Sequence, residues 1–152
     1  MKTIIAATAF VLYANSIFAQ QVKSQDVPKP VIDAFSENFK GASVKSWEKE
    51  KNGNYEAEFK FNKKEISATF SDDGTLIETE NEIAITALPQ MVLGIIEKDF
   101  PGFKISEVSQ ITMPSGAQTF ETEVKKGNEK FDLIFDSNGN FLMKKADAQE
   151  GN

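Results

Sequence analysis

Residues 55–61 read YEAEFKF and residues 120–126 read FETEVKK, so the same alternation of apolar and charged side chains occurs twice. Successive side chains of a β-strand point to opposite faces of a sheet. Each stretch therefore predicts a strand with one charged face and one apolar face, the latter formed in the first stretch by Tyr55, Ala57 and Phe59. We expect a helix to cover the apolar face and the charged face to remain in water.

The similarity extends to the residues before each stretch. VPKPVIDAFSENFKGASV, from Val27, aligns with LPQMVLGIIEKDFPGFKI, from Leu88. In both segments a proline stands where its missing backbone donor does no harm, apolar residues recur at helical spacing, and a glycine follows. Each segment predicts a short helix that ends near Gly41 or Gly102.

Three hairpin turns follow each predicted helix. They are marked by KNGN, FNKK and SDDG in the first half and by PSGA, KGNE and DSNGN in the second. The sequence therefore predicts an α+β fold: a tandem repeat of one helix plus a four-stranded antiparallel sheet, with the helices on one face of the sheet. If Asn62 and Lys63 form a two-residue turn, Phe59 pairs with Ile66.

The repeat sets the expected domain boundaries. Repeat one spans residues 27–87 and repeat two residues 88–145, together one domain, with a flexible segment at 20–26 and a frayed tail at 146–152. The joining stretch NEIAITALP, from Asn81, is too apolar for a free tether. We expect the halves to share one continuous sheet or one packed interface.

Residues 1–19, MKTIIAATAFVLYANSIFA, place one lysine before a long apolar run that ends at Ala19. This pattern is typical of a secretory signal peptide. An uncleaved membrane anchor is the alternative, but Asn15 and Ser16 interrupt the apolar run and no stop-transfer charge cluster follows. We expect cleavage, and a periplasmic or secreted protein without a membrane span.

The composition argues against several classes of function. The chain of 152 residues has a formal net charge of −6 and contains no arginine, so it lacks the clustered cations that bind nucleic acid. Histidine and cysteine are also absent. The usual nucleophile–base arrangements and zinc sites therefore lack their groups, and we expect no cofactor and no enzymatic activity.

The stretch DSNGN, residues 136–140, resembles the start of a calcium-binding loop, with Asp147 further along as a last ligand. However, Phe141 stands in place of the required glycine, and Asp147 replaces the bidentate glutamate. A hairpin turn is the interpretation that we prefer, and the sequence predicts no metal site. Calcium binding at the hairpin ends is kept as a third hypothesis.

The charged strand faces form the candidate binding surface. Neighbouring glutamates on such a face repel each other, and a basic partner surface would relieve the repulsion. The loop at 51–54 or at 113–117 would add an edge contact. Trp47 would anchor an interface if exposed and would belong to the core if packed under the helix. The predicted partner-binding residues are Glu56, Glu58, Lys60, Glu65, Glu121, Glu123, Asn52 and Trp47.

The same carboxylates leave a second function open. Glu56 and Glu58, like Glu121 and Glu123, are two residues apart on one strand, which separates neighbours by about 7 Å. A comparable gap separates the two carboxylates of glycosidases. A carboxylate-dependent hydrolase acting on glycan or peptide is therefore the alternative, although it would also need a cleft and one carboxyl group with a raised pKa.

Several longer stretches carry a family resemblance: VPKPVIDAF, WEKEKNGNYEAEFKFNKKEISATFSDDGTLIETE, LPQMV, FPGFKI and FDSNGNF. From Val27 to Lys145 the chain resembles the PepSY-like, β-lactamase-inhibitor-like proteins, small exported proteins common in Bacteroidetes. The resemblance implies a fold like that of the β-lactamase inhibitory protein, whose sheet presents a polar, concave face to a protein partner. It implies an exported, non-enzymatic, inhibitor-like binding module. This chain departs from the better known inhibitors in having no cysteines and no aromatic anchors on the outer face.

A weak homodimer through an open edge strand is a further expectation.

Overall fold

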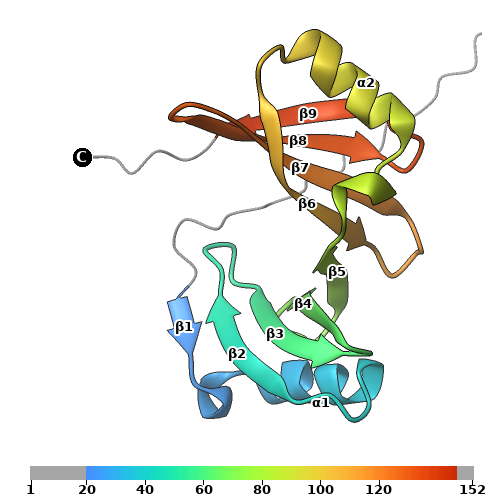
Figure 1. Cartoon of the computed structure of the whole chain (residues 1–152). Helices are drawn as coiled ribbons and strands as arrows, with labels where there is room; N and C mark the ends of the chain where they lie inside the picture. Colours follow the sequence, from blue (N-terminus) through green and yellow to red (C-terminus); the bar gives the residue numbers. More distant parts are fainter. Residues whose placement is uncertain (1–19, 147–152) are drawn as a thin grey trace, which may run out of the picture.

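A computed structural model describes residues 20–146 and has an α+β fold, in which one antiparallel sheet carries two helices (Figure 1). The strands are β1 (Gln20–Val22), β2 (Val44–Lys49), β3 (Tyr55–Phe61), β4 (Lys64–Phe70), β5 (Leu76–Glu82), β6 (Lys104–Thr112), β7 (Gln118–Lys126), β8 (Glu129–Asp136) and β9 (Phe141–Ala146). The helices are α1 (Lys29–Asn38) and α2 (Gln90–Asp99), with short 3-10 helices η1 (Ser24–Asp26) and η2 (Ile85–Ala87). Each strand pairs with the next one in the chain, so the order in the sheet is the order in the sequence.

The predicted signal peptide at 1–19 and most of the predicted tail at 146–152 lie outside the described residues. The segment 20–26, expected to be flexible, instead contains β1 and η1. The reason is that β2 leaves an edge free, and Gln20–Val22 pairs with it. Within residues 20–146 no helix is both long and apolar enough to cross a membrane.

Both helices form as the sequence predicts. Pro28 and Pro89 are the residues that precede the first turn, and the buried residues of each helix are four apart, Val31 with Phe35 and Val92 with Ile96. Because the remaining side chains are largely polar or half-exposed, each helix buries only one stripe against the sheet.

The predicted hairpin register is confirmed. Phe59 pairs with Ile66, and Lys60 with Glu65, across a turn formed by Asn62 and Lys63. Asn62 and Lys63 have φ values of 51° and 68°. Positive φ at both central residues is the requirement of the tight turn whose twist matches that of the two strands.

The four strands of each predicted repeat, β2–β5 and β6–β9, are joined into one nine-stranded sheet, in which β1 is the additional strand. The joining contact is the pairing of β5 with β6, where Thr79 pairs with Thr112 and Glu82 with Ser109. The expectation of a shared continuous sheet is confirmed, so the two predicted four-stranded units are parts of one sheet and do not form sheets of their own. The apolar joining stretch keeps the two halves close enough for their edges to pair.

The pairing also decides that both helices cover the same face of the sheet. Directly opposed residues of an antiparallel ladder share a face. Ala68 pairs with Thr79 and Thr79 with Thr112, and Val108 lies four residues from Thr112 on the same face of β6. Ala68 packs in the core with α1, and Val108 packs in the core with α2. In Figure 1 α1 lies at the bottom and α2 at the top, so the sheet curves with its helix-free face inside.

The interior consists of two separate apolar clusters, one under each helix. The first is aromatic: the rings of Phe35 and Phe59 meet edge to face, with centroids 4.9 Å apart. Trp47 belongs to this cluster, is only 2% exposed, and lies 5.8 Å from the Phe35 ring. Its proposed role as a partner-binding anchor is therefore wrong, because α1 covers it.

Each half also packs a hairpin tip against the start of its helix. Gly74, in the turn between β4 and β5, has a φ of 90°, and a Cβ there would come within 2.5 Å of the backbone oxygen of Pro30. Gly139, in the turn between β8 and β9, has a φ of 86° and lies against Met91 and Val92. Only glycine combines this backbone conformation with such a close approach.

The core of the second half contains one unsatisfied polar group. Thr122 on β7 is fully buried, and its hydroxyl is the one buried side-chain donor or acceptor within residues 20–146 that lacks a hydrogen-bond partner. Val108 and Leu133 flank it on the neighbouring strands. A buried hydroxyl without a partner costs free energy that a methyl group of the same size does not.

We predict that Thr122→Val raises the free energy of unfolding by about 1 kcal/mol, because the substitution keeps the shape and removes the unsatisfied hydroxyl. Urea denaturation followed by circular dichroism measures the change. Thr119→Val, on the opposite face of the same strand and half-buried, is the control and should change stability by less than about 0.5 kcal/mol. A loss of stability in Thr122→Val would contradict the prediction.

Candidate partner-binding face

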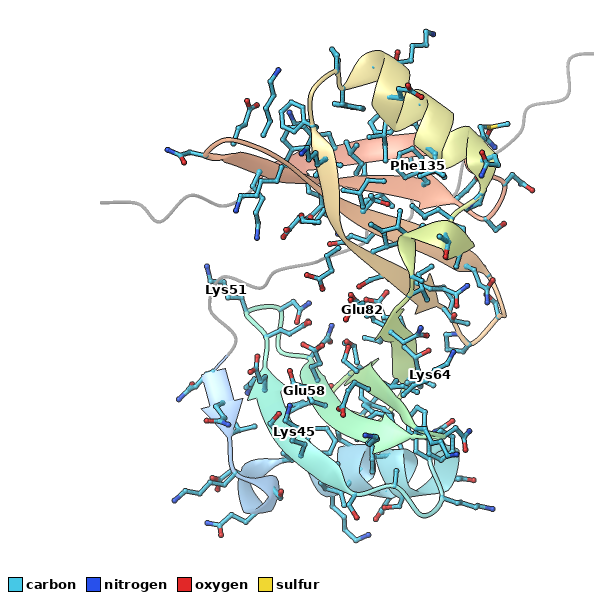
Figure 2. The ribbon with its side chains drawn as sticks, viewed as in Figure 1. Lys45, Lys51, Glu58, Lys64, Glu82 and Phe135 are labelled. Carbon is cyan, nitrogen blue, oxygen red and sulfur yellow. The ribbon has the colours of Figure 1, made fainter. Side chains whose placement is uncertain are left out.

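The sheet face opposite the two helices gathers acidic side chains from both halves, and we call it the acidic face. The pairing of the strands identifies the residues of this face, since residues that pair across neighbouring strands lie on the same side of the sheet. In Figure 2 Glu58 and Glu82 lie on this side of the sheet, whereas Phe135 lies on the α2 side. The carboxylates of the acidic face are Glu48, Glu56, Glu58, Glu65, Glu78, Glu80, Glu82, Glu107, Glu121, Glu123 and Asp132.

Predicted site residues from both repeats meet on this face. Glu56 and Glu58 of β3 and Glu121 and Glu123 of β7 are all half-buried members of it. Lys60 and Glu65 lie at the outer end of the β3–β4 hairpin, with Nζ and Oε1 3.8 Å apart, and both are exposed.

Asn52 lies apart from these residues, in the turn between β2 and β3. Its side-chain amide donates to the carboxylate of Glu50 at 2.8 Å, and its Oδ1 accepts the backbone N–H of Asn54 at 2.9 Å. These bonds give Asn52 a local role in shaping the turn, at the rim of the acidic face.

Some carboxylates of the face are neutralised by lysine. Glu121 accepts from Lys145 at 2.7 Å, and both side chains are only 15% exposed. Glu123 pairs with Lys130 and also accepts from the Ser106 hydroxyl at 2.6 Å. These contacts lower the pKa of Glu123 below its usual range.

Glu80 occupies the centre of the face, on β5 beside the junction of the two halves. Burial raises its pKa to about 7, more than the hydrogen bond from Ser109 lowers it. The charges of Glu121, Glu56 and Glu78 raise it further. Glu80 therefore binds a proton near neutral pH, and carboxylates from both halves influence it.

Three other carboxylates of the acidic face also have raised pKa values. Burial is the main cause that raises the pKa of Glu56 and of Glu78, and repulsion from nearby glutamates adds to it. Burial with the charges of Glu121 and Glu123 raises the pKa of Asp132 to about 6. The centre of the face thus holds more negative charge than its lysines neutralise.

Two shallow hollows flank Glu80. One, of about 240 Å³, is lined by Glu80, Glu107, Ser109, Glu121, Glu123, Lys130 and Asp132. The other, of about 220 Å³, extends toward the first half and is lined by residues that include Lys45, Glu58 and Ser67. Glu80, Glu107 and Ser109 line both, so the hollows meet at the β5–β6 junction.

The acidic face is less exposed to solvent than the sequence analysis predicted. Ile111 and Ile134 are buried, although register places both on the acidic face, opposite Glu80 and Glu121. Curvature of the sheet encloses the centre of the face, which explains why burial is the largest cause of the raised pKa values. The expectation of a fully solvated face is therefore wrong at its centre and holds at its rim, where Lys60 and Glu65 are exposed.

Sequence reasoning missed most of the central residues. Glu78, Glu80 and Glu82 stand at every second position of LIETENE, residues 76–82, so the alternation rule would have found them. The missed members on other strands, Glu107 and Asp132, give no comparable pattern in the sequence.

No group of three or more carboxylates within residues 20–146 is arranged to hold a metal ion. In the turn between β8 and β9, Asp136 Oδ1 accepts the backbone N–H groups of Asn138 and Asn140, each at 2.9 Å. The turn itself thus uses the carboxylate that a calcium loop would offer, and Asp147 lies outside the described residues.

We predict that Glu80→Gln stabilises the protein above pH 7. A raised carboxyl pKa means that the folded state holds a proton which the unfolded state releases, so stability falls as the pH rises from about 4.5 to about 7. Glutamine removes that loss, on the order of 3 kcal/mol, and flattens the slope. Thermal denaturation from pH 5 to pH 8 measures it, with Glu82→Gln at an exposed position of the same strand as the control. Equal slopes in wild type and Glu80→Gln would contradict the prediction.

Comparison with known proteins places the fold in a family. The family model described as "Putative beta-lactamase-inhibitor-like, PepSY-like" matches residues 17–78 and 53–143. No curated protein matches the chain.

Several solved structures share the fold. A BLIP-like protein from Bacteroides fragilis has 25% sequence identity and a TM-score of 0.65, over 82% of this chain and 89% of that chain. A "putative periplasmic" protein from Bacteroides eggerthii has 18% identity and a TM-score of 0.69, over 79% of this chain and 88% of that chain. A DUF2874 family protein from Bacteroides ovatus has 19% identity and a TM-score of 0.68, over 78% of this chain and 86% of that chain. Since the family model matches both helices and most of the sheet, the chain belongs to the family of PepSY-like, β-lactamase-inhibitor-like proteins.

Proposed function

We propose that the protein is an exported, non-enzymatic binding module that recognises a protein partner with a basic surface through the acidic face. The observation that carries the proposal is the gathering of carboxylates from both halves around Glu80. Burial raises the pKa values of Glu56, Glu78 and Glu80, and the charges of neighbouring glutamates raise them further.

The energetics favour a cationic partner. Two like charges about 7 Å apart repel by about 0.6 kcal/mol in water and by about 2.4 kcal/mol at an effective dielectric constant of 20. The half-buried centre of the face resembles the second case more than the first. A lysine or arginine from a partner would replace this repulsion with attraction and would also speed association.

The periplasm is the compartment that we propose. The leader pattern of residues 1–19 supports export, and the similar protein from Bacteroides eggerthii is described as "putative periplasmic". Inhibition of a β-lactamase is the finer role that the family description suggests. The acidic face offers carboxylates rather than aromatic anchors, so we propose a partner chosen by charge.

We further propose that the chain arose by duplication of one unit of a helix and four strands. The unit α1 with β2–β5 has the same element order as α2 with β6–β9. Gly74 and Gly139 support the proposal, since each packs its hairpin tip on the start of the helix in its own half. Duplication would explain why two acidic strand faces exist to be joined.

We predict that Glu58→Lys combined with Glu123→Lys abolishes capture of the partner. Each substitution reverses one charge on the acidic face, one in each half. Affinity capture from an envelope extract of the host, with quantitative mass spectrometry, measures the loss. Glu37→Lys with Glu97→Lys makes the same change in net charge on the two helices, at exposed positions, and should leave capture intact. Equal capture by both double variants would refute the role of the face.

A carboxylate-dependent hydrolase is the second candidate, because Glu80 supplies the raised pKa that such an enzyme needs and lies beside a hollow. Incubation with glycan and peptide substrates separates the candidates. Turnover that disappears in Glu80→Gln would favour the hydrolase, whereas the binding module gives no turnover in either protein.

A further inference from the structure

Strand β9 (Phe141–Ala146) ends the sheet and pairs along one edge only, with β8. The strand at the same position of the first half is β5, whose outer edge pairs with β6. No strand within residues 20–146 occupies the corresponding edge of β9. An unpaired edge presents backbone donors and acceptors that a further strand can use.

Large apolar side chains are exposed along this edge. Phe141, Leu142 and Met143 are consecutive and are 43%, 49% and 38% exposed. Among the described residues the other large exposed apolar side chains are Ile85, on η2, and Met91, which lies against Gly139 at the tip of the β8–β9 hairpin. Three of the five thus belong to β9, and Met91 of α2 lies against the turn beside it, which makes this edge the most apolar exposed part of the described surface.

The two lysines of β9 do not protect the edge. Lysines that point into water commonly keep edge strands from pairing with other chains. Here Lys145 donates to Glu121 at 2.7 Å and is 15% exposed, and the Nζ of Lys144 lies 3.3 Å from the centroid of the Phe131 ring. Each ammonium group contacts a side chain on a face of the sheet, Glu121 or Phe131, and is therefore not directed at a strand that approaches the edge.

We propose that β9 pairs with β9 of a second copy of this chain, antiparallel about a two-fold axis at Met143, so that the sheet continues from one chain into the other. Leu142, the extra residue of a bulge between the pairs Phe135–Phe141 and Ile134–Met143, lies next to this axis, and the register sets no like charges directly opposite each other. The chain has a net charge of −6, whereas the charged residues of β9 are lysines and Lys145 is neutralised by Glu121, so this edge adds little like-charge repulsion between two copies. A two-fold pairing also closes on itself and does not propagate into a filament.

The dimer would use the unpaired backbone edge of β9, whereas partner capture would use the carboxylates of the acidic face, so the dimer and the proposed function can fail independently. Sedimentation equilibrium of the exported protein, from micromolar to millimolar concentration, tests the dimer. We expect a mass that rises from one chain to two. A single-chain mass at every concentration would overturn the proposal.

Charge substitutions at the axis test the register. Met143→Lys and Met143→Glu each place like charges opposite each other across the axis, so each variant alone should remain a monomer, and an equimolar mixture should recover the dimer. Ile85→Lys, a matched change at an exposed position outside β9, should dimerise like wild type. Circular dichroism confirms folding of each variant. Dimers of either Met143 variant alone, or a mixture that stays monomeric, would overturn pairing centred on Met143.

Discussion

The pairing of β5 with β6 is the contact on which the arrangement of the acidic face depends. It consists of four residue pairs, from Thr79 with Thr112 to Glu82 with Ser109. Because side chains alternate along both strands, this register turns the apolar faces of the two halves the same way, and both helices cover one side. A shift by one residue would turn the carboxylates of one half toward the helix of the other. The acidic face exists because this register places the charged sides of the two halves on the same side of the sheet.

The pairing of β5 with β6 also brings carboxylates that repel one another to the centre of the acidic face. Glu80 lies at the junction, where curvature buries it and where carboxylates of both halves act on it. Lys145 and Lys130 neutralise Glu121 and Glu123, but these ion pairs lie to one side of the centre. A fold selected for stability alone would place a lysine or an apolar residue at such a position. Sites that violate the local rules of stability are commonly functional sites, which is why the centre of the face is the strongest candidate for recognition.

Local patterns in the sequence predicted the elements well. The helices, the hairpin turns and the pairing of Phe59 with Ile66 all depend on contacts between residues close in the chain, so periodicity and turn residues are sufficient. The wrong predictions concern longer distances. The sequence did not decide whether Trp47 is an interface residue or a core residue, because its burial depends on where α1 lies. The segment 20–26 was expected to be flexible because its partner strand begins more than twenty residues later.

By itself the sequence determined the amphipathic strands, the two helices that cover them and a chemistry limited to carboxylates and lysines, since these follow from side-chain alternation and from the absence of histidine, cysteine and arginine. Only the tertiary structure decided that the two acidic faces merge, that Glu80 lies at their centre and that β9 keeps an open edge. The physical reason is that burial and the charge felt by a carboxylate depend on neighbours brought together by sheet pairing and curvature, and a one-dimensional pattern does not specify those neighbours.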